Sequence, residues 1–148
     1  MQRARGFTLI ELLVVFAILA LLLGLAPVAF DRLRDGAQYR DTVRNMTSQL
    51  RTARYRSVAE GREIVFTLDM NRRAFGLDGA AWRPVPEALR LRAIVAGSEV
   101  QGSGSAAIRF LPSGGATGGS IEILRPNGGT RLRVDWLSGR VTQEGLTP

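Results

Sequence analysis

An apolar segment close to the N-terminus constrains the fold of this chain more than any other feature. Leu12–Phe30 contains no charged residue, and two arginines, Arg3 and Arg5, precede it. Read as a helix over residues 7–30, the segment spans about 36 Å at about 1.5 Å per residue, enough to cross a hydrocarbon core of about 30 Å. Because flanking basic residues stay in the cytoplasm, we expect a single-pass span with the C-terminal part of the chain exported.

A basic start before an apolar run is also typical of a secretory signal peptide. Here the run is longer than the apolar core of about 7–15 residues that such peptides carry, and no Ala-x-Ala cleavage site follows it. Gly24-Leu25-Ala26-Pro27 is the nearest candidate, and its proline makes it a poor one. We therefore interpret the segment as a retained anchor.

Glu11 is the anomaly at the start of this segment. A carboxylate in an apolar helix costs on the order of 3 kcal/mol at the bilayer centre and less near the interface. An ionisable residue in such a position predicts a functional role. The alternative is that Glu11 lies close enough to the lipid headgroups to cost little.

The composition excludes most of the common catalytic mechanisms. The 148 residues include no Cys and no His, and all 20 basic residues are Arg. Thiolate and histidine chemistry, disulfides and lysine Schiff bases are therefore excluded. The formal net charge of +7 is spread along the chain rather than gathered in one run. It is compatible with a solvated surface or with a patch for nucleic acid, anionic lipid or an acidic protein.

Apolar residues at steps of three and four predict that one helix continues from about Thr8 to Ala59, with Gly61 as its C-cap. The positions beyond the apolar segment are Leu33, Ala37, Val43, Met46, Leu50, Ala53 and Val58. From Arg62 onward the period changes to two, which predicts an antiparallel sheet. The expected strands are Ile64–Met70, Ala74–Leu77, Leu89–Val95, Ala107–Leu111, Ser120–Arg125, Thr130–Leu137 and Arg140–Gln143. Asn127-Gly128-Gly129 predicts a hairpin, and Gly79–Pro86 and Gly97–Ser105 are expected to be loops.

The predicted strands contain no set of residues that is typical of a catalytic, metal or cofactor site. Carboxylates are scattered rather than clustered, the glycine clusters lack a following lysine, and no serine has a histidine partner. We therefore expect no catalytic residues, no metal and no cofactor. The aromatic residues that fall in predicted strands are expected in the core rather than on a stacking surface; these are Phe66, Phe75, Phe110 and Trp136.

The residues Arg5-Gly6-Phe7-Thr8-Leu9-Ile10-Glu11-Leu12 resemble the class III leader of type IV pilins and type II secretion pseudopilins. The resemblance implies that a prepilin peptidase cuts between Gly6 and Phe7 and methylates the new amine of Phe7. It also gives Glu11 a role, because in that family this glutamate pairs with the N-terminal amine of a neighbouring subunit. Two charges that are costly alone in lipid would then neutralise each other between chains.

A second resemblance covers roughly the last forty residues. Phe110-Leu-Pro-Ser-Gly-Gly, Ile121-Glu-Ile-Leu and Leu137-Ser-Gly-Arg-Val141 are similar to the C-terminal domain of the GspH/FimT group of minor pilin-like proteins. FimT-type members bind DNA through a C-terminal Gly-Arg-x-Arg element. This chain has Gly139-Arg140-Val141-Thr142, so the second arginine is absent, and nucleic acid is a disfavoured partner. Under the alternative hypothesis of DNA uptake or pilus assembly, Arg131, Arg133 and Arg140 would form a basic edge.

Together these features predict an α+β, pilin-like fold that carries a minor pseudopilin function and no enzymatic activity. The expected divisions are a leader over 1–6, a membrane-spanning helix over 7–30, the periplasmic half of the helix over 31–61 and an antiparallel sheet domain over 62–148. The resemblance implies the inner membrane of a Gram-negative bacterium as the location. It implies other major and minor pseudopilins, the prepilin peptidase, the inner-membrane assembly platform and membrane lipid as partners.

Overall fold

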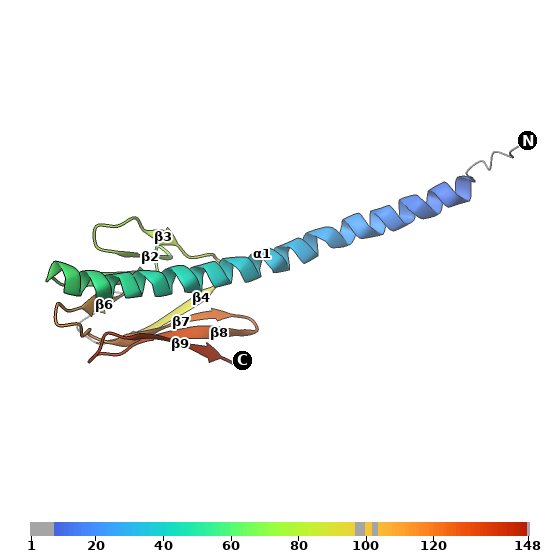
Figure 1. Cartoon of the computed structure of the whole chain (residues 1–148). Helices are drawn as coiled ribbons and strands as arrows, with labels where there is room; N and C mark the ends of the chain where they lie inside the picture. Colours follow the sequence, from blue (N-terminus) through green and yellow to red (C-terminus); the bar gives the residue numbers. More distant parts are fainter. Residues whose placement is uncertain (1–7, 97–99, 102–103, 148) are drawn as a thin grey trace, which may run out of the picture. The chain divides into compact units, whose positions relative to one another are not determined.

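The computed structural model describes residues 8–96, 100–101 and 104–147 (Figure 1). The chain forms two units, Met1–Ala37 and Gln38–Pro148, and helix α1 (Leu9–Glu60) contributes to both. Gly61 follows the helix with a φ of +63°, a left-handed conformation that glycine adopts without a steric penalty. The predicted helix and its glycine C-cap are therefore confirmed.

Within the second unit, the C-terminal half of α1 lies along two sheets and buries one stripe of side chains (Figure 1). The stripe repeats at steps of three and four; its members are Tyr39, Val43, Met46, Leu50, Ala53 and Ser57. Two predicted members were wrong, because Ala37 and Val58 are exposed. Ser57 takes the last buried position, where its Oγ lies 2.8 Å from the Arg54 carbonyl and 3.2 Å from the Leu111 carbonyl.

The first sheet has five strands in the order β3-β2-β1-β6-β5, and every pairing is antiparallel. The strands are β1 (Ile64–Asp69), β2 (Ala74–Leu77), β3 (Arg83–Pro84), β5 (Val100–Gln101) and β6 (Ser105–Phe110). Alternation along β1 places Phe66 and Leu68 in the core, as the period of two predicts. The strand β1 is the centre of the sheet, between β2 and β6.

The second sheet has four antiparallel strands in the order β4-β7-β8-β9. Its strands are β4 (Arg90–Val95), β7 (Gly119–Arg125), β8 (Gly128–Val134) and β9 (Val141–Leu146). The predicted hairpin joins β7 and β8, with Arg125 opposite Gly128 at its end. Ile121, Ile123 and Leu132 point inward and are almost fully buried, so this sheet and the first enclose a single core with α1.

The structure corrects three details of the sheets. Two predicted loops each contain a two-residue strand, β3 and β5, which pair with β2 and β6. The predicted strand Thr130–Leu137 ends at Val134 because Asp135 starts a turn, with its backbone N donating to the Arg140 carbonyl at 3.0 Å. Trp136 therefore lies in this turn with 67% of its surface exposed, and its placement in the core was wrong.

Candidate functional site

The first turn of α1 is capped by a side chain. Thr8 precedes the helix, and its Oγ1 accepts a hydrogen bond from the backbone N of Glu11 at 3.3 Å. The Thr8 carbonyl also accepts from the backbone N of Leu12 at 3.2 Å. Threonine followed three residues later by glutamate is the signature of a capping box, and a carboxylate in the first turn interacts favourably with the helix dipole.

The contact uses the backbone N of Glu11, and this capping by Thr8 was not predicted from the apolar pattern. The Thr8-x-x-Glu11 spacing was the signal in the sequence that could have found it. Glu11 is exposed in the single chain, and its pairing with a neighbouring subunit stays a prediction. Gly6 and Phe7 lie outside the described residues, so the cleavage and methylation site stays a prediction.

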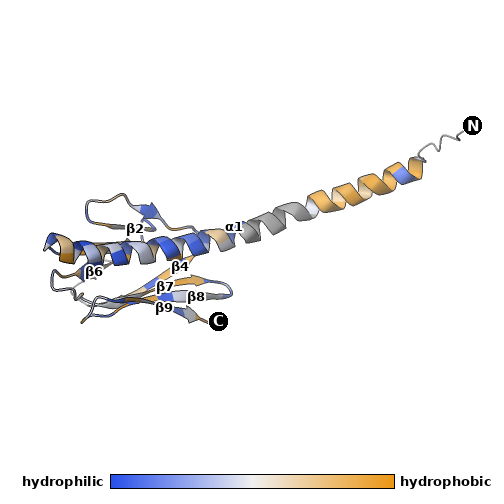
Figure 2. Ribbon diagram, viewed as in Figure 1, coloured by the Kyte–Doolittle hydropathy of each residue, from blue (hydrophilic) through white to orange (hydrophobic). Residues whose placement is uncertain are grey.

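The large apolar side chains of the first part of α1 are exposed in the single chain. Large apolar residues between Leu9 and Leu23 have exposed fractions from 45% at Val15 to 83% at Leu9. Figure 2 shows this part of α1 as predominantly hydrophobic, in contrast to the second half of the helix. Over the portion of the chain that the structure describes, no helix combines the length and hydropathy of a membrane span. The predicted span over 7–30 includes residues outside that portion.

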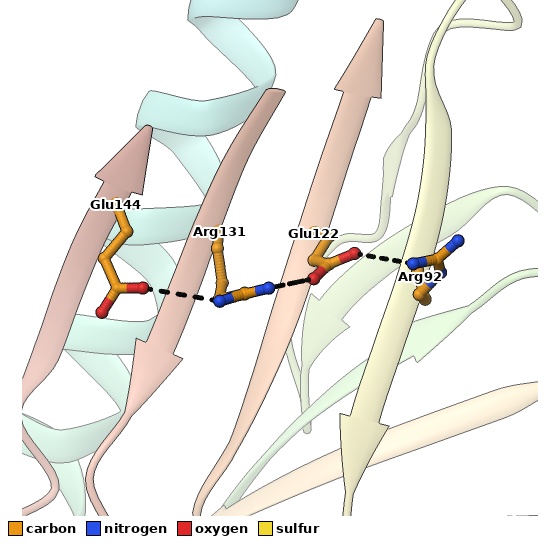
Figure 3. Close-up of polar contacts among 4 residues, drawn as sticks. All are labelled: Arg92, Glu122, Arg131 and Glu144. Atoms are coloured by element: carbon orange, nitrogen blue, oxygen red, sulfur yellow. Dashed lines mark hydrogen bonds and ion pairs between the residues drawn. The ribbon is translucent and has the colours of Figure 1, made fainter. Parts of the chain in front are cut away.

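Arg131, one of the three predicted basic residues, belongs to a row of alternating charges across the second sheet (Figure 3). Arg92, Glu122, Arg131 and Glu144 lie directly opposite one another on β4, β7, β8 and β9. Arg131 Nη2 is 2.8 Å from Glu122 Oε1 and its Nη1 is 3.7 Å from Glu144 Oε2, while Arg92 Nη1 is 3.4 Å from Glu122 Oε2. Arg131 is therefore neutralised on two sides.

Glu122 is the centre of this row, although it is on the face of the sheet away from the core. Its side chain is only 5% exposed, because the two arginine side chains flank it. The hydrogen bond to Glu122 raises the pKa of Arg131, and the nearby charge of Glu144 adds to this effect. The row is a structural ion-pair network rather than an open anion site.

Arg133 and Arg140 are exposed near the turn between β8 and β9. They line a shallow cavity together with Asp135, Ser138, Thr142 and Glu144. Asp135 Oδ1 accepts hydrogen bonds from Ser138 Oγ at 2.7 Å and from its backbone N at 2.8 Å. These bonds lower the pKa of Asp135, and the bond from the Ser138 hydroxyl has the larger effect. The three predicted arginines thus lie in one region, with three carboxylates among them.

The described residues contain no group of three His, Cys, Asp or Glu side chains arranged to hold a metal ion. The carboxylates of the second sheet are engaged with arginines instead, as Glu122 illustrates. The geometry offers a charged sheet face, a capped helix start and an exposed apolar helix.

Comparisons with known proteins agree with this geometry. Residues 1–27 match the prokaryotic N-terminal methylation motif, and residues 42–139 match the family model described as type II transport protein GspH. The chain is 31% identical over 140 residues to type II secretion system protein H of Xanthomonas campestris pv. campestris, covering 95% of this chain and 83% of the relative.

Two solved structures show the same fold at low sequence identity. The minor pseudopilin EpsH from the type II secretion system of Vibrio cholerae has a TM-score of 0.56 at 15% identity, covering 75% of this chain and 98% of EpsH. The type IV minor pilin FimU of Pseudomonas aeruginosa has a TM-score of 0.55 at 14% identity, covering 76% of this chain and 92% of FimU. The predicted α+β pilin-like fold is thereby confirmed.

A long N-terminal helix with a methylation motif, packed on antiparallel sheets, defines a pilin-like protein. Within that class, the chain belongs to the GspH family of type II transport proteins. The prediction of a minor pseudopilin of type II secretion is confirmed by this membership.

Proposed function

We propose that this chain is processed, anchored and assembled through its N-terminal helix as a subunit of a periplasmic pseudopilus. The observation that carries the proposal is the capped apolar helix whose large apolar side chains between Leu9 and Leu23 are 45% to 83% exposed. Such a surface needs a membrane before assembly and neighbouring helices after it, because exposed apolar area in water is unfavourable.

In the proposed sequence of events, prepilin peptidase cuts between Gly6 and Phe7 and methylates the Phe7 amine. The chain stays in the inner membrane with its sheet domain in the periplasm. At the assembly platform, Glu11 pairs with the Phe7 amine of a neighbouring pseudopilin, and the subunit joins the filament near its tip. The filament then drives exported proteins through the outer membrane. The chain contributes assembly and force transmission rather than catalysis.

The alternative, a FimT-like pilin that takes up DNA, finds less support in the arrangement of the arginines. Arg131 is held between Glu122 and Glu144, so its charge is compensated. Thr142 stands where the DNA-binding element of FimT-type proteins has its second arginine. DNA affinity depends steeply on the number of phosphates that basic residues neutralise, so both features weaken binding.

Deletion and complementation in the native host test the proposal. We expect deletion of the gene to abolish export of a type II reporter exoprotein and to leave DNA uptake unchanged. Restoration by the wild-type gene excludes a polar effect on neighbouring genes. Normal export combined with lost DNA uptake in the deletion strain would contradict the proposal and support the alternative.

A further inference from the structure

A basic groove runs along the C-terminal half of α1, on the side that faces β9. Two cavities of about 740 Å³ and 720 Å³ make up this groove, and they share Arg51 and Tyr55. Thr47 and Gln143 join the helix to β9 at its floor, with Gln143 Nε2 donating to Thr47 Oγ1 at 2.7 Å. The strand β9 is the edge of its sheet, and no described strand pairs with its outer side.

The groove concentrates positive charge, although Arg140 at one end also lines the cavity that contains Asp135 and Glu144. Five arginines line it: Arg40, Arg44, Arg51, Arg54 and Arg140. No aspartate or glutamate is among the described residues that line either cavity. The structure shows no ion pair between these arginines and any described carboxylate, whereas the arginines of the second sheet have partners such as Glu122.

The spacing of the helix residues explains how the charges gather. Arg40, Arg44 and Arg51 follow one another at steps of four and seven, which places them on one face of the helix. Tyr55 and Val58 continue the same face toward the end of α1 and are 74% and 53% exposed. This face lies beside the buried stripe, so its arginines can reach over the groove while their Cα atoms remain fixed by the packed helix.

The lining is not purely basic, and this bears on what can occupy it. Val43, Tyr55, Val58 and Val141 contribute apolar surface between the arginines. A nucleic-acid backbone would use the arginines and leave these apolar side chains without a partner. A protein segment with alternating carboxylate and apolar side chains satisfies both kinds of surface.

We propose that this groove is a docking site for an acidic segment of another protein, in which apolar residues separate the carboxylates. The helix residues that line it extend over residues 39–59, about 30 Å at about 1.5 Å per residue. An extended segment of about nine residues has that length at about 3.3 Å per residue. The site is separate from the N-terminal helix start and does not depend on Glu11 or on filament assembly.

Fluorescence anisotropy on the full-length protein in a neutral detergent tests the proposal. The probes are a labelled (Glu-Val)5 peptide, a labelled (Glu-Ser)5 peptide and a labelled duplex DNA. The groove variant is R44E/R51E, and the matched control is R83E/R90E, which makes the same change in net charge at exposed arginines outside the groove. A milder variant, Arg51→Gln, covers the case in which the double reversal disturbs folding, and circular dichroism checks all variants.

We expect the groove variant to weaken (Glu-Val)5 binding about tenfold at low salt, because two attractions become repulsions, and the control to change it less than about twofold. Arg51→Gln should give a smaller loss in the same direction. The wild-type protein should prefer (Glu-Val)5 over (Glu-Ser)5, which carries the same charge. Equal losses in groove and control variants, no preference between the peptides, or tighter binding of DNA than of either peptide would each overturn the proposal.

Discussion

Arg131 on β8 donates two hydrogen bonds to a single carboxylate oxygen of Glu122 on β7, from Nε at 3.1 Å and from Nη2 at 2.8 Å. The two residues are directly opposite in the register of the sheet. Figure 3 shows the pair within its row, flanked by Arg92 and Glu144. The contact ties the central strands of the second sheet together on the face away from the core.

The first prediction concerns this pair. Arg131→Met removes both hydrogen bonds and leaves the Glu122 carboxylate, 5% exposed, with Arg92 alone at 3.4 Å. Leaving a buried carboxylate without its principal donor costs on the order of 1–3 kcal/mol. We expect a lower midpoint of urea unfolding, measured by circular dichroism on the full-length protein.

Arg133→Met is the matched control, since Arg133 is exposed on the same strand and face, two positions further along. It should leave the unfolding midpoint almost unchanged. Equal destabilisation by the two substitutions would show that the Glu122 contact contributes nothing beyond a surface charge.

A second prediction follows from the turn between β8 and β9. Hydrogen bonds from Ser138 lower the pKa of Asp135, so the folded protein favours the ionised carboxylate. The resulting stability is present above the unfolded-state pKa of about 3.9 and is lost as the pH falls through the lower folded-state value. Ser138→Ala should therefore destabilise the protein at neutral pH, with a deficit that shrinks below about pH 4.

Urea unfolding of wild-type and Ser138→Ala proteins at about pH 7, 5 and 3 measures this deficit. The Gly139 backbone N also donates to the Asp135 carbonyl, and this bond is retained in the variant. A deficit of the same size at all three pH values would mean that the hydroxyl acts through packing and not through the charge of Asp135.

The third prediction concerns processing. We expect the mature protein to lack Met1–Gly6 and to carry one added methyl group on Phe7, as measured by intact-mass and peptide mass spectrometry. Gly6→Leu should block cleavage, because a side chain at the scissile position replaces a residue that has none, and precursor should accumulate in the membrane. Normal maturation of Gly6→Leu would place the cleavage site elsewhere.

Regular alternation made most of the fold predictable from sequence. Ala74–Leu77 was predicted with the bounds of β2, and Ile64–Met70 differs from β1 by one residue, since local periodicity decides both strands. The two-residue strands β3 and β5 were missed because each is too short to show a period of two and is defined only by its pairing with β2 or β6. The prediction placed Trp136 in the core because it extended the strand too far. A turn from Asp135 to Gly139 ends the strand, and Trp136 lies in that turn.

The candidate sites also differ in how far the sequence could predict them. The leader residues and Glu11 could be predicted because their signal is local in the sequence, and their roles stay predictions. The burial of Glu122 could not be predicted, since Arg92 and Arg131 reach it from neighbouring strands. The basic groove was equally hidden, because it joins arginines of α1 to Arg140, far along the chain.

The backbone N of Glu11 bonds to Thr8, and its carboxylate is the group proposed to pair with a neighbouring subunit, so substitutions can separate the two roles. Thr8→Ala removes the hydroxyl that accepts from the Glu11 backbone N and keeps the carboxylate. Glu11→Gln removes the charge and keeps an amide that suits the same position of a capping box. If the carboxylate neutralises the amine of a neighbouring subunit, Glu11→Gln should impair assembly more than Thr8→Ala does.

The measurement that tests the account most directly is co-isolation of this protein with the other pseudopilins from detergent-solubilised membranes. We expect Glu11→Gln to be inserted and cleaved normally but to lose co-isolation, because the neighbour's amine would enter the filament core without a counter-charge. Thr8→Ala should retain most of it. Co-isolation of Glu11→Gln at the wild-type level, with export of the reporter intact, would contradict the pairing and reduce Glu11 to a residue of the helix start.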